Sequence, residues 1–173
     1  RKRRAPRMTT RQGNLLGLAA CVGLLAYAYY AQVFLHLDPC PLCIFQRIGV
    51  FTLGSVFLAA AGQDGGLWAR RVYSLLLGLA ALATIGVAVR QLYIQSMPPG
   101  SVPACGASLD FMLKVFSLSE VLVKVLKGSG ECAKVTWTFL GLAMPPWVLI
   151  AVFVLGAYGI WNNLRRRAPV LRL

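Results

Sequence analysis

Cys40 and Cys43 form the first group in this sequence that could carry out chemistry, within the stretch DPCPLCIFQR. A Cys-Pro-Leu-Cys pair could be a structural disulfide, half of a zinc site or a redox dithiol. A disulfide that encloses so little chain stabilises a fold weakly, because the stabilisation grows with the loop that it closes. Structural zinc sites usually combine two close ligand pairs, and no such second pair follows. The spacing therefore favours a redox dithiol over a structural disulfide or a metal site.

Cys105 and Cys132 lie far apart in the second half of the chain. Together with Cys40 and Cys43 they allow three pairings. Sequence proximity favours Cys40 with Cys43, which leaves Cys105 with Cys132. Turn-forming residues precede both of the later cysteines, at 98–100 and at 128–130. A disulfide on such segments is accessible to an external thiolate, as an exchange relay requires.

Cys43 is expected in the first turn of a helix. Asp38 and Pro39 form a turn signal, Pro41 suits the first helical position, and an apolar stretch follows. The positive end of the helix dipole favours a thiolate there. Arg47 lies four residues after Cys43, on the same helix face, where its cation could add to this effect. The alternative for Arg47 is an interfacial arginine that reaches toward the lipid headgroups.

The elements that must position these residues are predicted to span a membrane. Of the 173 residues, 58% are hydrophobic and 13% are charged, compared with about 25% charged in soluble domains. We predict an all-α membrane protein, a four-helix bundle in one domain over residues 1–173. The predicted spans, each near the length that crosses a bilayer, are 14–37, 44–62, 72–89 and 146–161. Cys21 lies within the first span among small apolar residues and is assigned no chemistry.

Basic residues predict the orientation of these spans. They precede the first span, lie between the second and third at Arg70 and Arg71, and follow the fourth. The positive-inside rule therefore places both termini in the cytoplasm, and the Asp38 turn and the loop at about 96–145 on the outer side. The net charge of +13 is explained by these topology signals, so we expect no nucleic-acid binding. A cleaved signal peptide is the alternative for the N-terminus, but the apolar run through Leu35 is longer than a signal peptide needs.

The outer loop contains an amphipathic stretch from Asp110 to Lys127. Its polar residues recur every three or four positions, which predicts a helix with one polar face. Such a helix should lie along the membrane surface with its apolar face in the interface, because charges that recur every turn disfavour a span. The alternative is a helix packed against the outer surface of the bundle.

Four segments of the sequence carry a resemblance to a known family. The chain resembles the DsbB family of bacterial inner-membrane disulfide-generating proteins over nearly all its length after the basic start. The segments that carry the resemblance are CPLCIFQR, RQLYIQSMPP leading to PACG, SGEC, and FLGLAMPPWVL.

The resemblance implies a thiol:quinone oxidoreductase. A reduced DsbA-like periplasmic protein of the thioredoxin fold would attack the Cys105–Cys132 disulfide at Cys105. Cys132 would then attack Cys40, and Cys43 would pass electrons to ubiquinone or menaquinone. The site would comprise these cysteines, with Arg47 assisting.

The resemblance also implies that Arg90 and Gln95 contact the quinone head group. Two alternatives to the predicted function remain at this point. One is a related quinone-coupled oxidase with another dithiol partner, and the other is a disulfide-stapled membrane scaffold without turnover.

Overall fold

Four long helices form the body of the protein in the computed structural model, which describes residues 8–37, 39–63, 66–98, 114–127, 132 and 138–165. They are α1 (Thr10–Phe34), α2 (Pro41–Gly62), α3 (Leu67–Gln95) and α7 (Met144–Leu164). All four are long and apolar enough to cross a membrane. The predicted all-α bundle of four transmembrane helices is confirmed, and the chain is a multi-pass membrane protein.

The helices differ from the predicted spans mainly at their ends. α1 begins at Thr10 because Thr9 and Gln12 form a reciprocal capping box, with N–H···O distances of 2.8 and 3.1 Å. α3 has 29 residues and extends beyond the predicted 72–89 at both ends. A hydropathy reading misses these turns, because polar residues such as Arg70 and Gln91 lie in them while the backbone remains helical.

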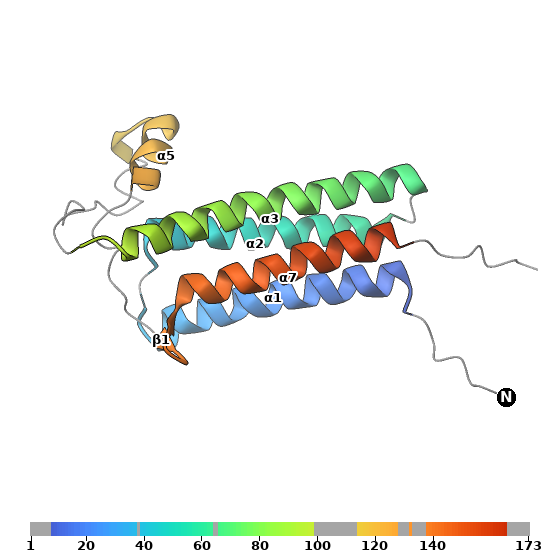
Figure 1. The fold of residues 1–173 in the computed structure, drawn as a ribbon, viewed down its shortest axis with the longest axis horizontal. Coiled ribbons are helices and arrows are strands. Elements are labelled where there is room, and N and C mark those ends of the chain that lie inside the picture. Colours follow the sequence, from blue (N-terminus) through green and yellow to red (C-terminus); the bar gives the residue numbers. More distant parts are fainter. Residues whose placement is uncertain are drawn as a thin grey trace, which may run out of the picture.

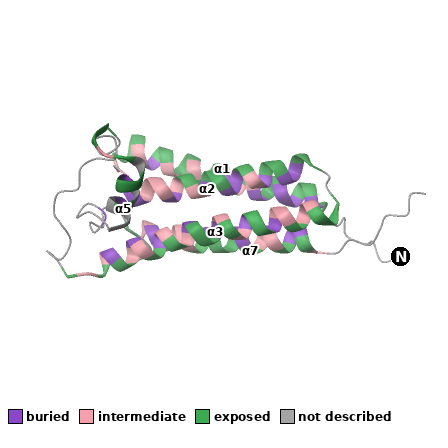
Figure 2. Cartoon of the chain, turned by 90° about the horizontal axis from the view of Figure 1, so that it is seen from above, coloured by how far each residue is buried: buried purple, intermediate pink, exposed green. Residues whose placement is uncertain are grey.

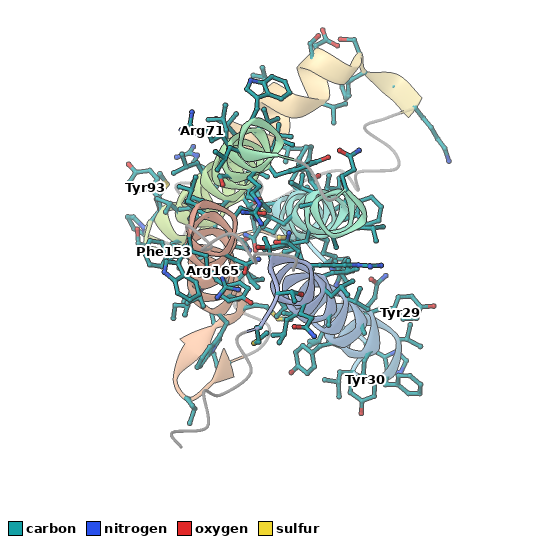
Figure 3. The ribbon with its side chains drawn as sticks, turned by 90° about the vertical axis from the view of Figure 1, so that its right-hand side faces the viewer. Tyr29, Tyr30, Arg71, Tyr93, Phe153 and Arg165 are labelled. Atoms are coloured by element: carbon teal, nitrogen blue, oxygen red, sulfur yellow. The ribbon has the colours of Figure 1, made fainter. Side chains whose placement is uncertain are left out.

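The four helices lie side by side, and α1 packs on α2, α2 on α3, α3 on α7 and α7 on α1. A core cluster that includes Cys21, Phe57, Leu77 and Val152 fills the centre. Much of the outer surface of these helices is exposed, as Figure 2 shows. Tyr29, for example, points away from the bundle in Figure 3 and is 67% exposed. Large apolar residues that face outward are what a lipid solvent favours.

Small residues let the helices approach closely. A Cβ at Gly156 of α7 would lie 2.7 Å from the Cβ of Ala81 in α3. That separation is too short for two carbon atoms, so the α3–α7 contact requires glycine at this position. Small residues at helix interfaces are typical of membrane bundles.

Cys21 is buried in this core, with 1% of its surface exposed and its thiol free. It packs with residues of the core cluster, among them Val50 and Leu53 of α2. The interpretation of Cys21 as a small buried apolar residue is confirmed.

A cluster of buried asparagines joins the start of α1 to the end of α7. Asn14 and Asn162 are fully buried and Asn163 is 3% exposed. Asn14 Oδ1 accepts from Asn162 Nδ2 at 2.9 Å and from Asn163 Nδ2 at 3.1 Å, and Asn14 Nδ2 donates to Asn163 Oδ1 at 3.2 Å. The first and last helices therefore meet at the same end of the bundle (Figure 1). We call this the amide end.

At the opposite end lie α5 (Leu118–Lys127) and an antiparallel hairpin of β1 (Thr138–Phe139) and β2 (Leu142–Ala143). The prediction of one helix over 110–127 is wrong in its described part. The chain leaves the helical conformation at Phe116 and Ser117, and α5 begins at Leu118, where the Ser117 N–H donates to the Glu120 carboxylate at 3.2 Å. Residues 110–113 lie outside the described residues. We call this end the cysteine end.

Candidate thiol site at the cysteine end

Cys40 and Cys43 lie together at the start of α2. Cys40 is the N-cap and Pro41 the first helical residue, so Cys43 is in the first turn, as predicted. Cys40 Sγ accepts from the backbone N–H of Cys43 at 3.3 Å. The two Sγ atoms are 2.8 Å apart, so little movement separates the dithiol from the ~2.05 Å of a disulfide bond.

Cys132 lies against this pair, although about ninety residues separate it from Cys40 in the sequence. Its side chain is hydrogen-bonded to that of Cys40. Both side chains belong to a buried cluster with Leu42, Val121 and Val125. The structure thus brings together three of the four predicted cysteines, and Cys105 lies outside the described residues.

The environment of Cys40 favours its protonated form. The hydrogen bond with the Cys132 side chain, a second one with Cys43, and burial together raise the pKa of the Cys40 thiol above its ordinary value. In the reduced protein Cys40 therefore retains its proton.

The apolar face of α5 covers the cluster. Val121 and Val125 are 3% and 4% exposed and pack against the cysteines and Ile94 of α3. The amphipathic stretch was expected either in the membrane interface or packed against the bundle. At Val121 and Val125, α5 packs against protein. α5 therefore lies over the sulfur atoms at the end of the bundle.

One glutamine that was not predicted as a site residue reaches the dithiol, and a second glutamine is bonded to the first. Gln91 Nε2 of α3 lies 3.3 Å from Cys43 Sγ and 3.4 Å from Cys40 Sγ. Gln46 Nε2 of α2 donates to Gln91 Oε1 at 2.7 Å. The signal in the sequence was their chemistry, because polar side chains within apolar spans usually face the bundle interior.

Arg47 follows Cys43 by one helical turn, and its guanidinium group reaches α1. Nη1 donates to Gln32 Oε1 at 2.6 Å, and Nη2 donates to the carbonyl of Ala28 at 3.1 Å. The side chain is half-buried. These bonds join Arg47 of α2 to α1. Its action on Cys43 remains a prediction.

Arg90 and Gln95 lie in the last turns of α3. The Arg90 guanidinium group lies over the Tyr93 ring, 5.3 Å from its centroid, and Gln95 is the final helical residue. Their predicted contact with a quinone remains a prediction. Gln91, between them in the sequence, is the residue of this segment with its amide against both sulfur atoms.

The chain is similar to known proteins of one family. Residues 10–162 match the family model described as Disulfide bond formation protein DsbB. A relative from Chromobacterium violaceum, named Disulfide bond formation protein B, is 49% identical over 92% of this chain and 96% of its own length. Relatives of the same name from Nitrosococcus oceani and Marinobacter nauticus are 45% and 46% identical, over 90% and 94% of this chain and 92% and 96% of their own lengths.

The fold and the site combine four apolar helices with a dithiol at a helix start and a third cysteine packed against it. The matches identify the family that has this combination. The chain belongs to the DsbB family of disulfide bond formation proteins.

Proposed function

We propose that this protein reoxidises a DsbA-like periplasmic dithiol protein and passes the electrons through Cys105 and Cys132 to Cys40 and Cys43, and then to membrane quinone. The observation that carries the proposal is the contact between the side chains of Cys132 and Cys40. Thiol–disulfide exchange requires one sulfur to attack another directly. A cysteine from the outer loop that rests on the dithiol of α2 meets that requirement.

The proposed orientation places the cysteine end in the periplasm. Arg11, Arg70, Arg71 and Arg165 lie on the opposite half of the bundle, at helix starts or ends, and Figure 3 views the molecule from that end. Basic residues beside spans favour the cytoplasmic side. The dithiol would then face a compartment in which disulfides persist.

The exchange can be written so that bonds and electrons balance. A thiolate of the partner attacks Cys105, breaks the Cys105–Cys132 bond and releases Cys132 as a thiolate. Cys132 attacks Cys40, which breaks the Cys40–Cys43 bond and releases Cys43 as a thiolate. The second thiolate of the partner displaces Cys105, so the partner leaves oxidised. Cys105 then attacks Cys132, which restores the outer disulfide and leaves Cys40 and Cys43 reduced.

The two sulfur atoms of the inner pair suit different roles in this sequence. The raised pKa of Cys40 makes its thiolate the poorer leaving group, which favours attack at Cys40 with Cys43 as the leaving group. Cys132 already touches Cys40. The amide of Gln91 and the first-turn N–H groups of α2 are positioned to receive the charge released on Cys43.

The residues around Arg47 fit a quinone. A quinone has polar carbonyl groups on an apolar ring and, when bound, accepts two electrons and two protons from the reduced dithiol. Arg47 supplies N–H donors and positive charge, and the neighbouring Ile48 and Phe51 are 53% and 65% exposed on the surface that faces lipid. We propose Arg47, with Arg90 and Gln95, as the residues that hold the head group.

The test uses the full-length protein in detergent with ubiquinone and a reduced DsbA-type protein. Cys43→Ser should abolish quinone reduction, followed by absorbance, because no inner disulfide can form. Cys21→Ser is the matched control, since Cys21 is buried in the core away from the dithiol; it should retain turnover. Cys132→Ser should also abolish turnover with the DsbA-type protein, because the outer disulfide that the partner attacks cannot form.

These outcomes also separate the alternatives. Full turnover by Cys43→Ser would disprove the relay. If the wild-type protein reduces quinone with a small dithiol but not with the DsbA-type protein, it serves another dithiol partner. If the wild-type protein reduces quinone with no dithiol, it is a scaffold without turnover.

A further inference from the structure

Gln46 and Gln91 are buried glutamines on neighbouring helices, α2 and α3. They are 4% and 3% exposed. A buried amide destabilises a fold unless its donors and acceptors find partners. The two amides are hydrogen-bonded to each other, and the NH₂ group of Gln91 donates to sulfur.

The hydrogen bond between the amides determines which end of Gln91 faces the cysteines. Gln46 Nε2 donates to Gln91 Oε1 at 2.7 Å, so that oxygen is engaged on the side of α2. Gln91 Nε2 then lies 3.3 Å from Cys43 Sγ and 3.4 Å from Cys40 Sγ. Cys43 Sγ is farther from Gln91 Oε1, at 3.7 Å. Gln91 therefore presents a donor to both sulfur atoms.

We propose that Gln91, oriented by Gln46, is a positioning residue that holds the reduced Cys40–Cys43 pair and stabilises the thiolate released from it. The role rests on the proposed function, in which that pair accepts electrons from the outer cysteines. An uncharged donor suits this position, because a cation on the sulfur atoms would remain uncompensated whenever the pair is a disulfide.

The expected consequence is a shift in the redox equilibrium of the pair. Stabilising the reduced form makes a disulfide more oxidising. Hydrogen bonds to charged groups are stronger than those between neutral groups, and losing one changes an equilibrium constant by roughly tenfold or more. Without Gln91 the pair should be about tenfold harder to reduce at neutral pH, equivalent to ~30 mV for a two-electron couple.

The experiment measures the equilibrium of the inner pair alone. Cys105→Ser and Cys132→Ser in the full-length protein leave Cys40 and Cys43 to equilibrate with glutathione or dithiothreitol buffers, and alkylation reports the reduced fraction. Gln91→Leu removes the donor. Gln91→Asn retains an amide but shortens its reach, and Gln46→Leu removes the group that orients Gln91. The expected size of the shift decreases in that order.

Thr84→Val is the matched control on α3. Thr84 is also a buried polar residue, but its hydroxyl donates within its own helix, to Ala80 O at 2.8 Å. This variant should have the wild-type equilibrium. The shift caused by Gln91→Leu should also shrink as the pH falls and both sulfur atoms hold protons, because the lost bond is then no longer to a charged group. A purely structural role for Gln91 would give no such pH dependence.

The outcomes test the inference separately from the proposed function. Equilibria within twofold of wild type for the folded Gln91 variants, or a shift toward easier reduction, would overturn it. If Gln91→Leu fails to fold, Gln91→Asn and Gln46→Leu decide. Neither the partner nor quinone enters this measurement. If Gln91→Leu shifts the redox equilibrium but the protein with all four cysteines has no turnover, only the proposed function is refuted. If that protein has turnover but Gln91→Leu shifts no equilibrium, only the role of Gln91 is refuted.

Discussion

The amide end and the cysteine end both bury uncharged polar side chains, but they bond them differently. At the amide end, Asn14 exchanges bonds of 2.9 to 3.2 Å with Asn162 and Asn163. At the cysteine end, a single amide group is shared by two sulfur atoms at 3.3 and 3.4 Å. Sulfur is a weak acceptor, so the second arrangement is the weaker of the two.

The difference follows from what each end must do. The asparagines tie the first helix to the last, and no step of the proposed reaction changes them. The sulfur atoms exchange covalent partners during each proposed cycle, so the bonds around them have to permit movement. A shared donor can follow either sulfur atom. The asparagine cluster and the reactive cysteines therefore lie at opposite ends of the bundle, separated by the full length of its helices.

The largest effect on stability is expected from Asn14→Leu at the amide end. It removes one hydrogen-bond partner from each of the buried Asn162 and Asn163 side chains and should lower the free energy of unfolding by about 2 kcal/mol. Thermal unfolding in detergent measures this. The redox equilibrium of Cys40 and Cys43 should remain at the wild-type value.

Leu16→Ala is the control for this variant, because Leu16 lies on the same helix and is 56% exposed. It should barely change unfolding. A redox shift in Asn14→Leu would contradict the separation of the two ends. An unchanged unfolding temperature would show that the asparagines do not tie the helices.

A smaller effect, on turnover, is expected from Arg47→Leu at the cysteine end. Losing the cation should weaken quinone reduction about tenfold, if its electrostatic contribution is near 1.4 kcal/mol. The initial rate at a series of quinone concentrations measures this. Arg47→Lys retains the charge but not the forked donor. Its rate of quinone reduction should lie between those of the wild type and Arg47→Leu.

Gln32→Leu distinguishes charge from helix packing. It removes one partner of the Arg47 guanidinium group, at 2.6 Å, and leaves the cation in place. Turnover close to wild type is expected. If Gln32→Leu and Arg47→Leu reduce turnover equally, Arg47 acts by joining α1 to α2 and not by its charge.

Local chemistry predicted the helices and the position of Cys43. Four long apolar stretches in the sequence are sufficient to predict four spans, because lipid requires every backbone group to be satisfied within a helix. Pro41 after Cys40 similarly predicts the start of α2. The break in the outer amphipathic stretch was also readable, since Ser117 and Glu120 have the spacing of a capping box.

The role of Gln91 could not be read in the same way. Arg90, Gln91 and Gln95 lie within six residues of one another, and successive residues of a helix point about 100° apart. Which of them meets the dithiol depends on the rotation of α3 against α2, and the packing of the whole bundle sets that rotation. The contact of Cys132 with Cys40 depends likewise on the fold of the outer loop.

The smallest effect is expected from Glu120→Ala, which tests how firmly α5 covers the cysteine end. The Glu120 carboxylate accepts from the Ser117 N–H at 3.2 Å on an exposed surface, and losing such a cap costs about 0.5–1 kcal/mol. If α5 must open before reagents reach Cys132, which is 1% exposed, alkylation of reduced Cys132 should accelerate roughly two- to fivefold. Glu120→Gln retains an acceptor oxygen and should stay near wild type. Equal rates in all three proteins would mean that Cys132 becomes accessible without the opening of α5, and the cysteine end would then be looser than its valine cover indicates.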